Sequence, residues 1–164
     1  MSLRTFDVDI VLWHKPGAVY AYVFGERDLA AAGADEAAAV EAVTSLAQRA
    51  DQHGYDLDSS DESEPVVRTI SVDLPVAFAD GVTELDARID VVTRAFHEGV
   101  AVFVPAAALD FLVPNLEGLR LAAREHIAAA FELDTRLGEL SNVLLDHGAD
   151  ETLTVVRRTV DRLP

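Results

Sequence analysis

Two aspartates near the N-terminus have a residue type and spacing suited to metal chemistry. Asp7 and Asp9 stand two residues apart in an alternating stretch, which would place both carboxylates on one face of a strand. Paired carboxylates can hold Mg²⁺ for phosphodiester cleavage, and Asp28 could supply a third ligand. The second half offers only Asp90 at the comparable position. A divergent metal-dependent nuclease is therefore one hypothesis. The favoured alternative is that these residues are the polar, solvent-facing side of an amphipathic strand.

No other motif supports catalysis or metal binding. Asp56, Asp58 and Ser60 have the opening spacing of a calcium loop, but Asp61 stands where that loop needs glycine. A zinc site needs converging ligands, and the histidines include no H-x-x-x-H pair. The chain has no cysteine, no G-x-S-x-G sequence and no glycine-rich phosphate loop. These histidines are His14, His53, His97, His126 and His147. From these absences we expect no catalytic residue, no metal and no cofactor, and hence no enzyme.

The net charge of the chain limits the kinds of molecule that it is expected to bind. Its 164 residues include 29 Asp and Glu but only 13 Lys and Arg, a formal net charge of −16, and Lys15 is the only lysine. Such a surface repels phosphate backbones, so we expect no direct nucleic-acid binding, whereas a basic protein would suit it. The alternative is an acidic surface that is only solvated. With no signal-peptide pattern and no run of about 18 apolar residues, we expect a cytoplasmic protein without a membrane segment.

The elements that must position these residues follow one plan in the first half. Alternation predicts a strand over 6–13, a turn at His14-Lys15-Pro16-Gly17, a returning strand over 19–24 and a weak third strand over 28–32 that ends at Gly33. A helix follows over 35–52 with Asp35 at its start and Gly54 beyond its end. Residues 55–65, YDLDSSDESEP, form an acidic, mobile loop, and 66–78 forms a strand in which Pro75 indicates an edge or an end.

The second half repeats this plan at a fixed offset. Val19 matches Val100, Val23 matches Val104, and Gly33 meets Pro114 without a gap. We expect strands over 86–96, 100–104 and 109–113, a helix capped by Asn115, a further short helix over 136–147 and a strand over 152–160. The fold class is therefore α+β, with two β-β-β-α-β units at 1–82 and 83–164. Each unit is an antiparallel sheet with a helix packed on one face.

The first unit resembles the N-terminal domain of HicB-like antitoxins. A hairpin, a short third strand and then Gly33-Ala34-Asp35-Glu36-Ala37-Ala38-Ala39-Val40 carry the resemblance, which covers residues 6–50 and more faintly 87–130. It implies a reduced ribonuclease-H-like sheet, apparently in two tandem copies, and a habit of neutralising a small basic RNase toxin. Gly25-Glu26-Arg27 replaces the family's Pro-rich link, and the second copy stands where the family carries its DNA-binding segment.

Aromatic residues on the first hairpin are the candidate partner-binding residues. If the helix covers the Val8 and Ile10 face of the sheet, these aromatics lie on the opposite face, where exposure would suggest a binding surface. The alternative places them between the two halves or in a homodimer interface. The candidates are Trp13, Tyr20, Tyr22, Phe24 and, in the second half, Phe103.

These observations predict a non-catalytic, HicB-like protein that binds and regulates a protein partner, such as a small basic RNase toxin. Two alternatives stay open: a recruiting or regulatory domain excised from a larger multidomain protein, and the metal-dependent nuclease.

Overall fold

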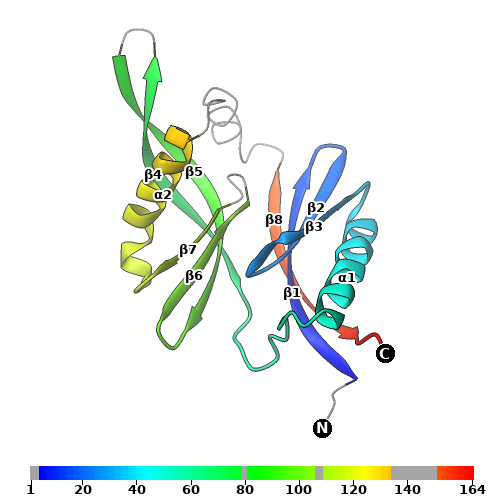
Figure 1. The fold of residues 1–164 in the computed structure, drawn as a ribbon. Helices are drawn as coiled ribbons and strands as arrows, with labels where there is room; N and C mark the ends of the chain where they lie inside the picture. The colour runs from blue at the N-terminus through cyan, green and yellow to red at the C-terminus, as the bar shows by residue number, and fades with distance from the viewer. Residues whose placement is uncertain (1–3, 79–80, 106–108, 134–150) are drawn as a thin grey trace.

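The protein is an α+β structure built from two four-stranded antiparallel sheets, each covered by one helix (Figure 1). The structure used is a computed structural model, which describes residues 4–78, 81–105, 109–133 and 151–164. The helix predicted over 136–147 lies outside these residues. The strand order is β3-β2-β1-β8 in one sheet and β4-β5-β6-β7 in the other. The predicted fold class is therefore confirmed.

The first unit contains β1 (Thr5–Lys15), β2 (Ala18–Val23), β3 (Glu26–Gly33), α1 (Glu36–Gln52) and β8 (Thr152–Asp161). Asp35 caps α1, because its side chain accepts a hydrogen bond from the Ala38 backbone N–H at 2.8 Å. The even-numbered side chains of β1 pack against α1, as the alternation predicts. This core contains Phe6, Val8, Ile10, Leu12, Val19, Ala21, Val23, Ala39, Val40, Val43, Ala47, Ala50, Leu57 and Val160.

The second unit contains β4 (Val66–Phe78), β5 (Gly81–Phe96), β6 (Gly99–Val104), β7 (Leu109–Val113) and α2 (Leu119–Leu133). Asn115 accepts a hydrogen bond from the Gly118 backbone N–H, but a short 3₁₀ turn at Leu116–Gly118 precedes the helix. β2 and β6 lie at the offset of the predicted repeat, since Ala18–Val23 corresponds to Gly99–Val104.

The two sheets exchange their outer strands relative to the sequence division at residues 82 and 83. The division assigned 66–78 to the first unit and 152–160 to the second, but β4 pairs with β5 and β8 pairs with β1. β4 and β5 are joined by a very short connection, so they form a hairpin at little loop-closure cost. The free edge of β1 is then completed by β8. The predicted correspondence between these two strands holds, because each adds antiparallel to the first hairpin strand of its sheet.

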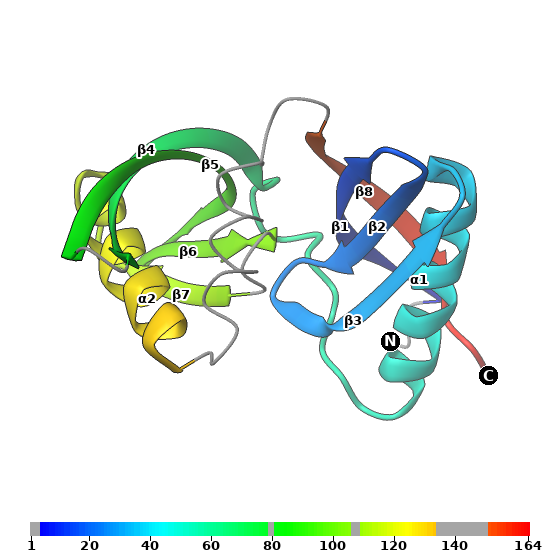
Figure 2. The same cartoon turned by 90° about the horizontal axis from the view of Figure 1, so that it is seen from above.

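Side chains from the helices hold the carbonyls of the exchanged strands. In α1, Gln48 donates to the Asp161 carbonyl at 3.0 Å. In α2, Arg120 and Arg124 donate to the Ser71 and Asp73 carbonyls at 2.8 and 2.9 Å. β4 and β8 are both sheet-edge strands, which agrees with the position of Pro75 in β4. The sheets face each other, and the helices lie on the outer sides (Figure 2).

Candidate functional site

The faces of the sheets that carry no helix meet in a third core, here called the inter-sheet cluster. Its buried members are Val11, Trp13, Phe24, Val92, Phe103 and Leu153, with Tyr22, Val67, Ala101 and Val155 partly buried around them. The rings of Tyr22 and Phe103 are 5.3 Å apart between centroids, which joins β2 of one sheet to β6 of the other. Burial raises the pKa of the Tyr22 hydroxyl, and nearby Tyr20 adds to the effect. This cluster fastens the two units together.

The cluster accounts for most of the aromatic residues predicted to bind a partner. Trp13 is 6% exposed, Phe24 is 9% exposed and Phe103 is 2% exposed, whereas Tyr20 is exposed at 38%. Trp13 also donates its indole N–H to Glu151 at 3.1 Å. The structure therefore places these residues between the two halves, as the alternative interpretation predicts. It leaves Tyr20 at the surface, where its ring lies 6.1 Å from that of Trp13.

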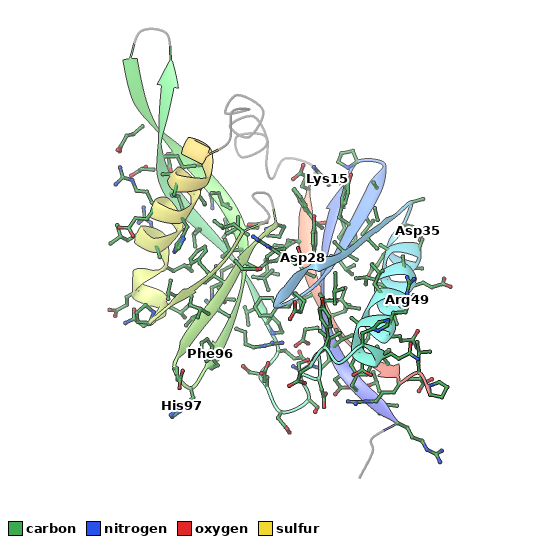
Figure 3. The ribbon with its side chains drawn as sticks, in the orientation of Figure 1. Lys15, Asp28, Asp35, Arg49, Phe96 and His97 are labelled. Carbon is green, nitrogen blue, oxygen red and sulfur yellow. The ribbon has the colours of Figure 1, made fainter. Side chains whose placement is uncertain are left out.

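The three aspartates of the nuclease hypothesis have separate surroundings. Asp9 is buried, and its carboxylate pairs with Arg94 from β5 and with Arg157 from β8. Asp7 accepts a hydrogen bond from the Thr159 hydroxyl at 2.7 Å. Asp28 is exposed on β3, in the region between the two units (Figure 3). The described part of the chain contains no group of three His, Cys, Asp or Glu side chains placed to hold a metal ion.

The Asp9 carboxylate is the centre of an ion network that joins both sheets to the acidic loop. Arg94 donates to Asp9, to the Glu62 carboxylate at 2.7 Å and to the Ser63 carbonyl at 3.0 Å. Arg157 donates to Asp9 at 2.8 Å and to the Glu62 carbonyl at 2.9 Å. Burial, with the like charge of Arg157, lowers the pKa of Arg94 to about 10. Nothing in the sequence pairs Asp9 with Arg94, because 85 residues separate them.

The acidic loop forms hydrogen bonds with the part of β1 that does not pair with β2. β2 ends at Val23, opposite Ile10, so the backbone of Asp7 is left without a partner from β2. The Ser59 backbone N–H donates to the Asp7 carbonyl at 2.9 Å, and the Asp7 N–H donates to the Asp58 carboxylate at 3.1 Å. Leu57 is buried in the core of the first unit. Leu57 to Ser59 therefore make specific contacts with the first unit, because the unpaired edge of β1 offers backbone groups that need hydrogen-bond partners.

Hydrogen bonds to the Asp58 carboxylate, with the charge of Arg162, have a larger combined effect on its pKa than its burial has. Burial by itself would raise the pKa of this carboxyl. The backbone N–H groups of Asp7 and Ser60, the Ser60 hydroxyl and the charge of Arg162 together lower the pKa below its ordinary value. Asp58 and Ser60 form a local turn, which gives the spacing of these two residues a structural role.

Two pockets open between the units. One is polar, has a volume of about 210 Å³, and is lined by Asp9, Phe24, Glu26, Asp58, Glu62 and Arg94 among others. The second, here called the β7 cleft, has a volume of about 260 Å³ and lies between the β2–β3 turn and the inter-sheet side of β6 and β7. Its lining includes Phe24, Gly25, Ala101, Asp110 and Leu112. It combines an apolar floor with acidic neighbours.

The described histidines do not converge on either pocket. His14 lies 3.4 Å from the Thr154 hydroxyl, His53 caps the end of α1, and His126 stacks on Phe111 with centroids 4.7 Å apart. His97 lies at the β5–β6 turn (Figure 3), and His147 is outside the described residues.

No helix in the described ranges is long and apolar enough to cross a membrane. No protein-family model, curated protein or solved structure matches this chain.

Proposed function

We propose that the chain is a non-catalytic binding module whose partner is a basic protein. The main support for the proposal is that most of the few Lys and Arg side chains form hydrogen bonds or ion pairs within the chain. The chain has 13 of them against 29 acidic ones, and in the described residues most bond to the chain's own oxygens. Such contacts are made by Lys15, Arg27, Arg49, Arg68, Arg94, Arg120, Arg124, Arg157 and Arg162.

A surface of this kind favours basic partners. Internal use of the arginines leaves carboxylates as the charged groups most available at the surface, and these repel nucleic acid and attract positive protein surfaces. A small basic ribonuclease, implied by the HicB-like resemblance, is one member of this class of partner. Against the nuclease hypothesis, the Asp9 carboxylate is already neutralised by two guanidinium groups. Asp7 is likewise occupied by Thr159.

The test is capture of proteins from the host's lysate by the immobilised chain at low and high salt, followed by mass spectrometry. We expect a basic protein that is retained at low salt and released as the salt rises, because screening weakens association between charges. Retention of nothing but the chain itself, or of acidic proteins insensitive to salt, would contradict the proposal. Calorimetry with Mg²⁺ and Mn²⁺ tests the nuclease alternative. Metal binding that is lost in Asp7→Asn would favour that alternative.

A further inference from the structure

The β7 cleft contains the most exposed large apolar side chain in the described residues. Leu112 is 67% exposed, although its neighbours Phe111 and Val113 are buried against α2. Alternation along the strand therefore places Leu112 on the inter-sheet side of β7. The β2–β3 turn reaches the same side with Phe24 and Gly25 but does not cover Leu112. Leu112 and the lining of the cleft together offer an apolar surface that a bound molecule could contact.

β7 is also the edge strand of the second sheet, as far as the described residues show. The second sheet ends at β7, whose only strand partner in the described residues is β6. The outer edge of a terminal strand presents backbone N–H and C=O groups without partners, and an extended peptide can add to such an edge. The free edge and the exposed Leu112 belong to the same five-residue strand. An incoming strand could therefore pair with the backbone and place side chains in the cleft.

The charge beside the cleft selects what such a strand carries. Asp110 faces Arg27 across the two units, with Nε and Oδ2 4.0 Å apart. Burial raises the pKa of Asp110; Arg27 opposes this, and the nearby charges of Glu26 and Asp28 add to it. Asp110, which lines the cleft, is thus close to one guanidinium and feels the like charge of two further carboxylates. A basic side chain entering next to Asp110 would relieve this repulsion.

We propose that the β7 cleft docks an extended partner segment that carries an apolar and a basic residue two positions apart, added as a strand to the edge of β7. The inference rests on the proposed function, because it names the surface that recognises the basic partner. This spacing follows from strand geometry, because Asp110 and Leu112 lie two residues apart on one face of β7. Side chains that meet them come from positions two apart in the added strand, an apolar one at Leu112 and a basic one at Asp110.

The test uses a fluorescent eight-residue peptide, Thr-Val-Thr-Arg-Thr-Val-Thr-Arg, in which Val and Arg alternate on one face, and matched variants of the full chain. We expect Leu112→Asp to weaken binding of this peptide about tenfold or more, measured by anisotropy, because it places a polar group in the apolar part of the contact. Leu121→Asp is the matched control, since Leu121 is 61% exposed but lies on α2, and it should change the Kd less than about twofold. Asp110→Asn should weaken binding several-fold and provides a second variant that keeps the strand apolar. A peptide N-methylated at alternate residues, on the edge that would face β7, should not bind.

The possible results distinguish failure of the proposed docking site from failure of the proposed function. Equal loss in Leu112→Asp and Leu121→Asp, or undiminished binding of the N-methylated peptide, would overturn the docking site. A partner captured from lysate that binds Leu112→Asp as well as the wild type would also overturn the site, while the proposed function would stand. If Leu112→Asp abolishes a dimer of the wild-type chain in sedimentation, the occupant is a second copy and the proposal fails.

Discussion

Replacing Asp9 by asparagine removes a charge from the point where two arginines converge. The Asp9 side chain is 1% exposed, that of Arg94 is 10% exposed and that of Arg157 is 20% exposed. Loss of one partner from a buried ion pair commonly costs about 3–5 kcal/mol, because the remaining charge stays buried without compensation. Arg94 keeps its contacts with Glu62 and the Ser63 carbonyl, and asparagine keeps one acceptor oxygen. We therefore expect a loss of about 3 kcal/mol, at the lower end of that range.

Urea unfolding followed by Trp13 fluorescence measures this loss directly. Trp13 is the only tryptophan and lies in the inter-sheet cluster, so its emission reports on the contact between the sheets. With an m-value of about 1–3 kcal/mol/M, the midpoint should fall by about 1–3 M urea without a change in slope. The double variant Asp9→Asn with Arg94→Gln should lose less than the sum of the two single variants, because the groups interact.

Glu84→Gln is the matched control for this reasoning. The Glu84 and Arg124 side chains pair at 2.5 Å, but they are 56% and 43% exposed. An exposed pair contributes about 0–1 kcal/mol, so the control should unfold close to the wild type. A loss in Asp9→Asn below about 1 kcal/mol, no larger than in Glu84→Gln, would show that the buried network does not hold the sheets together.

Three further predictions concern the acidic loop, a close approach and the strand exchange. Asp58→Asn should lower the free energy of unfolding by about 1 kcal/mol at pH 7. Because the folded-state pKa of Asp58 is lowered from 3.8, this stabilisation is present above that value and is lost as the pH falls through the lower folded pKa. The difference in urea stability between variant and wild type should therefore disappear in acid, and a difference that is independent of pH would contradict the hydrogen bonds assigned to Asp58. Gly33→Ala should destabilise the fold by about 1–3 kcal/mol, because an added Cβ would lie 2.5 Å from the Ala39 nitrogen, whereas Gly118→Ala, whose nearest neighbouring atom is at 3.9 Å, should be close to neutral in thermal unfolding. His14→Cys with Thr152→Cys should form a disulfide on oxidation, seen on a non-reducing gel, because these residues pair across β1 and β8; absence of the bond would contradict the placement of β8 in the first sheet.

The individual elements were predictable because their signals are local. Alternation identified β1, the Pro16-Gly17 turn identified the hairpin, and Asp35 identified the start of α1. The constant offset between Val19 and Val100 predicted the correspondence of β2 with β6, and the order of the elements in each half predicted the correspondence of β8 with β4. The class of fold follows from these elements, since each sheet needs a helix to cover one apolar face.

The partners of the strands and the use of the polar residues were decided only by the tertiary structure. β4 turns back on β5 because a short connection forms a hairpin more readily than a return to the first sheet, and β8 then completes β1. The exchange brings Arg157 of β8 to Asp9, and the packing of the two sheets brings Arg94 of β5, so a carboxylate that the sequence assigns to solvent is buried. The same packing buries Trp13, Phe24 and Phe103 between the sheets. Sequence periodicity shows which residues share a face of a strand, whereas what covers that face depends on contacts between residues far apart in the chain.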